Sequence, residues 1–173
     1  NIENIWGSEF GDYIVGVDGI DNEFVGNGGD DSIYGANGND TLEGGNDNDY
    51  IDAGSGDDSL FGGDGQDILV GGVGADFLDG GEGDDFAFYS GAASGVTVSL
   101  SDASKNTGEA AGDTYASIEW LLGSAFSDTL EGDTNDNSLQ GFEGKDHLIG
   151  LAGNDALVGE GGSDTLDGGE GDD

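Results

Sequence analysis

The sequence predicts an all-β protein that winds into a parallel β-roll, a solenoid with two nonapeptides in each coil. Three observations predict this fold. Residues 26–88 are seven consecutive nonapeptides without an insertion. Each has a glycine-rich first half, aspartate at position six and an apolar residue at position eight. Hydrophobic residues make up only 34% of the chain, which suits a thin two-layer core better than a globular one.

The strands are expected at the last three positions of each repeat. Side chains alternate along a strand, so position eight faces one side while positions seven and nine face the other. One apolar residue per strand cannot form a core, but two facing strands can, which makes two repeats the smallest closed coil. The expected core residues are Ile33, Leu42, Ile51, Leu60, Leu69, Leu78 and Ala87.

Stacked coils pair their strands in parallel, about 4.8 Å apart, so alternate repeats lie on the same side of the roll. The position-six residues then form two columns. One contains Asp31, Asp49, Asp67 and Asp85, and the other contains Asp40, Asp58 and Asp76. Carboxylates roughly 5 Å apart repel each other by about 1 kcal/mol in water and more at lower dielectric. Because calcium takes about six to eight oxygen ligands, calcium between successive turns would reverse this repulsion.

Zinc suits this chain poorly, because zinc prefers histidine and cysteine, and the chain has one histidine and no cysteine. The composition, with 38 glycines and a net charge of −37, also fits a disordered acidic linker. The strict phase of the apolar residues favours the roll, although without calcium the linker hypothesis gains strength.

With 39 acidic and two basic residues, nucleic acid and anionic membranes are poor partners. No stretch is apolar enough to insert into a membrane.

Residues 1–25 resemble a degenerate form of the repeat, with Asp12 in phase and Asn22 where aspartate is expected. This segment is expected to cap the roll, because an uncapped stack exposes its core and its strand edges. The bulky residues expected to close the end are Ile2, Ile5, Trp6 and Phe10.

Residues 89–117 interrupt the repeats and are expected to cap or connect, with a strand near 96–100 and a polar loop over 101–117. They are expected to cover the end of the first roll and to lead into a second roll, so that the two make a semi-rigid rod, and the alternative is a flexible tether between independent rolls. An aromatic cluster lies at the end of the repeats and the start of this segment, and it is interpreted as end packing rather than as a ligand groove. It consists of Phe77, Phe86, Phe88 and Tyr89.

Residues 118–173 repeat the opening of the chain and are expected to form a second, incomplete roll. Asn137 replaces one aspartate. The position-six aspartates here are Asp128, Asp146, Asp155, Asp164 and Asp173. The chain starts and stops within the pattern, which predicts a segment of a longer protein.

Catalytic chemistry is not expected. His147, the single histidine, falls at a solvent-facing position, and no nucleophile elbow accompanies it. The glycine runs are not followed by the Gly-Lys-Ser/Thr of a phosphate loop, and EF-hand spacing is not met. Any two carboxylates resemble a glycosidase dyad, but cation binding explains all of them together.

The nonapeptides, in the form Gly-Gly-x-Gly-x-Asp-x-apolar-x, resemble RTX (hemolysin-type) calcium-binding repeats. The resemblance implies a right-handed β-roll in a secreted bacterial protein, with several calcium ions in two columns. It also implies metal ligation by the position-six aspartates, including Asp12, Asp128 and Asp173, and by backbone carbonyls of positions one to four. The expected carbonyl ligands belong to Gly29, Gly38, Gly44, Gly45, Asn46, Asp47, Ala53, Gly54, Ser55, Gly56, Gly62, Gly63, Asp64, Gly65, Gly71, Val73, Gly80 and Glu82.

Two function classes stay open. The tandem modules favour a calcium-binding spacer in a large extracellular adhesin, surface-layer or matrix protein, in contact with neighbouring modules or copies of itself. The alternative is an ancillary module of a secreted protease, lipase or alginate epimerase. Calcium-dependent ice binding is a minor alternative, because position three offers no regular row of Thr and Asn.

Overall fold

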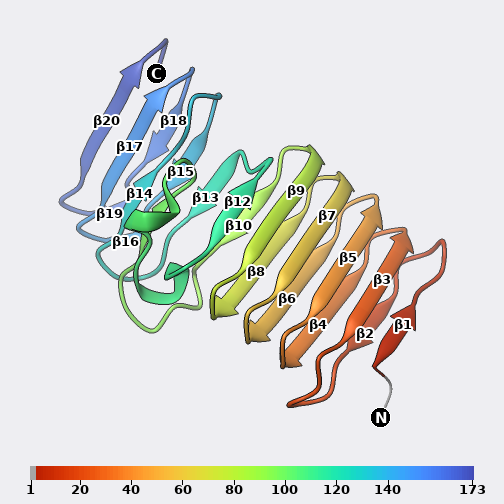
Figure 1. The fold of residues 1–173 in the computed structure, drawn as a ribbon. Coiled ribbons are helices and arrows are strands. Elements are labelled where there is room, and N and C mark those ends of the chain that lie inside the picture. The colour runs from red at the N-terminus through yellow and green to blue at the C-terminus, as the bar shows by residue number, and fades with distance from the viewer. Residues whose placement is uncertain (1–2) are drawn as a thin grey trace. The chain divides into compact units, whose positions relative to one another are not determined.

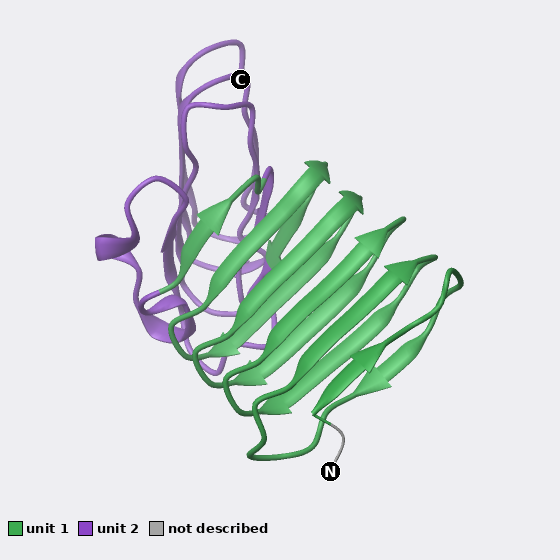
Figure 2. Ribbon diagram, turned by 45° about the vertical axis from the view of Figure 1, so that its right-hand side comes forward, with its two compact units in different colours: residues 1–87, 113–118 green, residues 88–112, 119–173 purple. Residues whose placement is uncertain are grey.

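The computed structural model describes residues 3–173, so Ile2 lies outside the described residues. The chain divides into two compact units (Figure 2). Unit one contains the residues up to 87 together with 113–118, and unit two contains 88–112 and 119–173. Both are β-solenoids of parallel strands with almost no helix (Figure 1), which confirms the predicted fold class.

Unit one has two sheets whose strands alternate along the chain, as two repeats per coil require. The first sheet follows the order β1 (Asn4–Trp6), β3 (Glu23–Gly28), β5 (Thr41–Asn46), β7 (Ser59–Gly65), β9 (Phe77–Gly83) and β12 (Thr114–Ala116). The second contains β2 (Tyr13–Val15), β4 (Ser32–Asn37), β6 (Tyr50–Ser55), β8 (Ile68–Val73) and β10 (Phe86–Phe88). The parallel register places like positions of alternate repeats side by side, for example Ile33 beside Ile51.

Unit two repeats this arrangement. One group of paired strands is β13 (Trp120–Leu122), β15 (Ser138–Gln140) and β18 (Ala156–Val158). A second sheet contains β11 (Thr97–Ser99), β14 (Thr129–Glu131), β17 (His147–Ala152) and β20 (Thr165–Glu170), and β16 (Glu143–Gly144) pairs with β19 (Gly161–Gly162). Two short 3-10 turns, η1 (Ala103–Lys105) and η2 (Gly108–Ala110), follow β11.

Most repeat strands are longer than the expected three residues. Strands β3 to β9 have six or seven residues, because pairing continues past position nine into the glycine-rich half. Ala36 pairs with Gly54 and Asn37 with Ser55, although these residues belong to the turn in the sequence pattern. The glycine-rich half is therefore part of the ladder.

The core is the predicted one in the repeats. Ile33, Ile51 and Leu69 are fully buried on the second sheet, as are Leu42 and Leu60 on the first. The same holds for Leu78 and Ala87. His147 is exposed, as its position predicted, while the following Leu148 is buried.

The prediction of a polar loop over residues 101–117 is wrong for the end of that range, where β12 forms a strand. Asp113, Thr114 and Tyr115 restore the aspartate-x-apolar spacing, and β12 pairs with β9 through Thr114 and Phe77. The earlier part of this segment is fixed within unit two, where Lys105 forms an ion pair with Glu131 at 2.6 Å.

Ala36 should tolerate replacement by glycine with a gain in stability. It occupies position two with a φ of +81°, a conformation that costs an L-residue about 1–2 kcal/mol. The greater freedom of glycine in the unfolded chain offsets part of this, so we expect a net gain of roughly 0.5–1 kcal/mol. Chemical denaturation in calcium measures it.

Ala53→Gly is the matched control, because Ala53 is fully buried and is not among the described residues with positive φ. This change should destabilise the protein by roughly 0.5–1 kcal/mol. Equal effects of the two substitutions would contradict the backbone argument.

Candidate metal centre

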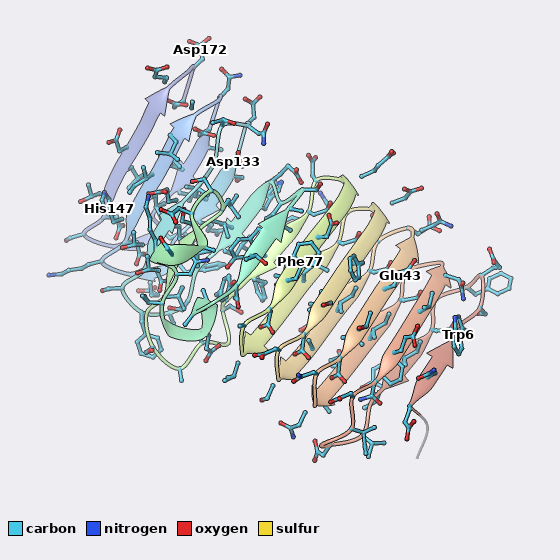
Figure 3. All side chains as sticks on the ribbon, in the orientation of Figure 1. Trp6, Glu43, Phe77, Asp133, His147 and Asp172 are labelled. Carbon is cyan, nitrogen blue, oxygen red and sulfur yellow. The ribbon has the colours of Figure 1, made fainter. Side chains whose placement is uncertain are left out.

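The position-six aspartates lie directly before the strands, at the two edges of the roll, and the parallel register stacks them in columns. Asp31 precedes β4 and Asp49 precedes β6 on one side, and Asp40 precedes β5 on the other. All seven aspartates of the repeats in residues 26–88 are at least 97% buried. The outward positions of the same strands carry side chains such as Glu43 and Phe77, which are labelled in Figure 3.

One oxygen of each column carboxylate is used by the fold. Asp49 Oδ1 accepts the backbone N–H of Asp31 at 2.8 Å, and Asp67 Oδ1 accepts that of Asp49 at 2.8 Å. In the other column Asp58 Oδ1 accepts the N–H of Asp40 at 2.7 Å. These bonds link coils along the stack, so the two predicted columns are present.

The second oxygen of eight column carboxylates is buried and has no hydrogen-bond partner among the described residues. This holds for Oδ2 of Asp31, Asp40, Asp49, Asp58, Asp67, Asp76, Asp146 and Asp155. A buried charged oxygen without a partner is costly, and it requires either a cation or a proton. The columns therefore present a row of anionic oxygens suited to a hard cation.

Carbonyl oxygens converge on the same places. A Cβ atom on Gly26 would lie 2.5 Å from Gly44 O and against Asp31 Oδ2. A Cβ atom on Gly62 would likewise lie 2.5 Å from Gly80 O and against Asp67 Oδ2. Carboxylate and carbonyl oxygens are the donors that calcium prefers, so the chemistry of the donor set fits this ion.

Burial raises the pKa of several column carboxylates. Desolvation, followed by the charges of the neighbouring column members, raises the pKa of Asp49 and of Asp58 to about 7. The pKa of Asp76 rises to about 6, mainly through desolvation, with the charge of Asp113 contributing. At neutral pH the buried negative charges of the columns therefore destabilise the folded state unless a cation compensates them.

Side chains alone do not complete a site. In residues 3–173, no group of three or more His, Cys, Asp or Glu side chains is arranged to hold a metal ion. Calcium here would need backbone carbonyls beside the carboxylates, as in many oxygen-rich sites. The individual carbonyl ligands named above stay a prediction.

The turn backbone explains the glycines at positions two and four. Gly63 at position two has a φ of +118°, and Gly65 at position four has a φ of +153°. Side chains at these positions adopt the same region at a cost, as Asn27 and Asp47 do with φ values of +80° and +75°.

The other predicted position-six residues fall into two groups. Asp164 Oδ1 accepts the N–H of Asp146 at 3.1 Å, and Asp173 Oδ1 accepts that of Asp155 at 3.0 Å, so both extend columns of unit two. By contrast, Asp12 Oδ2 and Asp128 Oδ2 accept hydrogen bonds from Ser8 and Ser124. The Oδ2 atoms of Asp12 and Asp128 therefore have hydrogen-bond partners, unlike those of the eight aspartates named above.

Two features were missed from the sequence. Asp113 extends a column, since its Oδ1 accepts the N–H of Asp76 at 2.9 Å. Position five also forms a ladder on the surface, in which Asn39 Oδ1 accepts the N–H of Asp57 and Asp57 Oδ1 accepts that of Ala75. The signals were the Asp-Thr-Tyr spacing at residue 113 and the frequent Asn and Asp at position five.

Comparison with protein families gives one family. The model described as RTX calcium-binding nonapeptide repeat (4 copies) matches residues 25–60, 52–87, 116–141, 122–157 and 140–173, which cover more than half of the chain. A search of curated proteins found no match. In residues 3–173 no helix has the length and apolar character needed to span a membrane. By its repeats, its solenoid and its aspartate columns, the chain belongs to the RTX calcium-binding nonapeptide repeat family.

Proposed function

We propose that this chain is a structural module that folds outside the cell by binding several calcium ions in columns along its edges. One observation carries the proposal: in eight column aspartates, among them Asp49, Asp58 and Asp67, Oδ1 accepts an N–H of the neighbouring coil while Oδ2 is buried with no partner among the described residues. A metal-independent roll has no reason to bury a row of such oxygens. The family's calcium-binding character supports the same conclusion.

The module serves as a spacer in a large extracellular adhesin, surface-layer or matrix protein. Two units built from the same repeat support this role, because tandem solenoids add length without adding a catalytic site. The alternative is an ancillary calcium-binding module of a secreted enzyme. The sequence of the whole gene separates the two: many copies of the module favour the spacer, and one catalytic domain favours the enzyme.

Calcium titration tests the binding step. We expect several calcium ions per chain, bound cooperatively, with affinities in the high micromolar to millimolar range of extracellular modules, on the order of 10⁻⁴–10⁻³ M. Magnesium should compete poorly, because it requires a smaller octahedral site and releases its water reluctantly. Isothermal titration calorimetry measures both ions. Binding of no calcium, or equal binding of magnesium, would contradict the proposal.

A further inference from the structure

The first glycine-to-aspartate turn of each unit closes differently from the repeat turns. In unit one, Ser8 donates its backbone N–H to Asp12 Oδ2 at 2.6 Å and its hydroxyl to the same oxygen at 3.0 Å. In unit two, Ser124 donates to Asp128 Oδ2 in the same way, at 2.6 and 3.0 Å. The oxygen that lacks a partner in the repeats is satisfied here by a serine of its own turn.

The backbone of these turns also differs. The repeats have positive φ at position two, as at Gly63 with +118°. Ser8 and Ser124 occupy position two, and neither is among the described residues with positive φ. Hydrogen bonding and backbone conformation therefore separate two classes of turn, one closed by its own serine and one with an orphaned carboxylate oxygen.

The serine-closed turns share a sequence. Residues 7–12 and 123–128 both read Gly-Ser-x-Phe-x-Asp, with phenylalanine where the repeats place the position-four glycine. The backbone N–H groups of Phe10 and Phe126 donate to the serine hydroxyls at 3.3 and 3.0 Å. The hydroxyl thus bridges the phenylalanine N–H and the aspartate, which fixes the turn with protein atoms alone.

The second turn of each unit carries an asparagine in place of the column aspartate, and the amide makes hydrogen bonds through one of its two polar atoms, while Asn22 Oδ1 and Asn137 Nδ2 are buried with no partner among the described residues. Asn22 Nδ2 donates to Ile20 O at 2.6 Å and to Asp40 Oδ1 at 3.0 Å. These are a carbonyl and a carboxylate oxygen, the kinds of oxygen that ligate calcium. Asn137 Oδ1 accepts the N–H of Asp133 at 2.8 Å, again within one turn.

We propose that these four turns, at residues 7–12, 16–22, 123–128 and 132–137, bind no calcium and give each unit a first coil closed by hydrogen bonds. This coil offers a fixed strand edge on which the calcium-dependent coils assemble. A cation at Asp12 or Asp128 would displace two serine donors, and at Asp128 it would leave the buried backbone N–H of Ser124 without a partner. The inference rests on the proposed calcium binding and replaces the expectation that Asp12 and Asp128 are metal ligands.

A gain of binding tests the inference. Ser124→Gly together with Phe126→Gly converts residues 123–128 to Gly-Gly-x-Gly-x-Asp, the form of the repeat turns. We expect the variant to bind one more calcium ion per chain than the unmodified protein, by calorimetry and native mass spectrometry. Ser127→Gly, at position five of the same turn, keeps both closing residues and should leave the number unchanged.

The outcomes are distinct. If the unmodified protein binds no calcium, the proposed function fails. If it binds calcium and the folded double variant binds the same number, the inference is overturned. Should the double variant not fold, crystals of the unmodified protein grown in calcium decide: anomalous density beside Asp58 but not between Ser124 and Asp128 supports the inference. A calcium peak between Ser124 and Asp128 overturns it.

Discussion

Removal of calcium at pH 8 should unfold the rolls, and acidification of the calcium-free chain to pH 5 should restore folded structure. The pKa values of Asp49 and Asp58 rise from 3.8 to about 7 in the folded chain. Between about pH 4 and 7, the calcium-free folded state therefore binds more protons than the unfolded state, and its stability falls as the pH rises through that window. We expect the folded state to gain about 2 kcal/mol or more at pH 5 relative to pH 8.

The calcium-loaded protein should respond in the opposite sense. Calcium binds the ionised carboxylates, so protons compete with it and the loaded fold loses stability as the pH falls. Thermal unfolding followed by circular dichroism measures both cases, with calcium removed by a chelating resin because soluble chelators weaken in acid. A calcium-free chain that is equally unfolded at both pH values would contradict the role of the buried columns.

The sequence predicted the parts of the fold that obey the nine-residue period. Asp49 and Ile51 are examples: an aspartate and an apolar residue at fixed spacing lie buried one coil from their counterparts Asp67 and Leu69. A strict period determines which residues become neighbours, because every coil repeats the same geometry.

Features that do not follow the nine-residue period were not predicted from the sequence. Asp113 lies 37 residues from Asp76 instead of 18, so its place in the column depends on the intervening segment. The serine-closed turns looked like worn repeats, because a single serine in place of glycine does not reveal which atoms it bonds. The length of the strands was also missed, since pairing through positive-φ residues such as Ala36 follows from coil stacking rather than from local propensity.

Asp58→Asn should weaken calcium binding while keeping the link between coils. Asparagine retains an oxygen that accepts the N–H of Asp40, which now lies 2.7 Å from Oδ1. Its NH₂ group replaces Oδ2, the oxygen left without a partner among the described residues, and an amide nitrogen cannot ligate calcium. Because Asp58 lies between Asp40 and Asp76 in its column, we expect two sites to lose affinity by about tenfold or more.

Asp57→Asn is the matched control, one residue earlier, with the same change of charge. Asp57 is exposed at position five, and its Oδ1 accepts the N–H of Ala75 at 3.1 Å, a bond that asparagine also makes. Its calcium affinity should stay close to that of the unmodified protein, and calorimetry of the three proteins gives the comparison. Because both variants lose one negative charge, equal losses would show that calcium responds to the general acidity of the chain. A loss confined to Asp58→Asn would place the ions in the column itself.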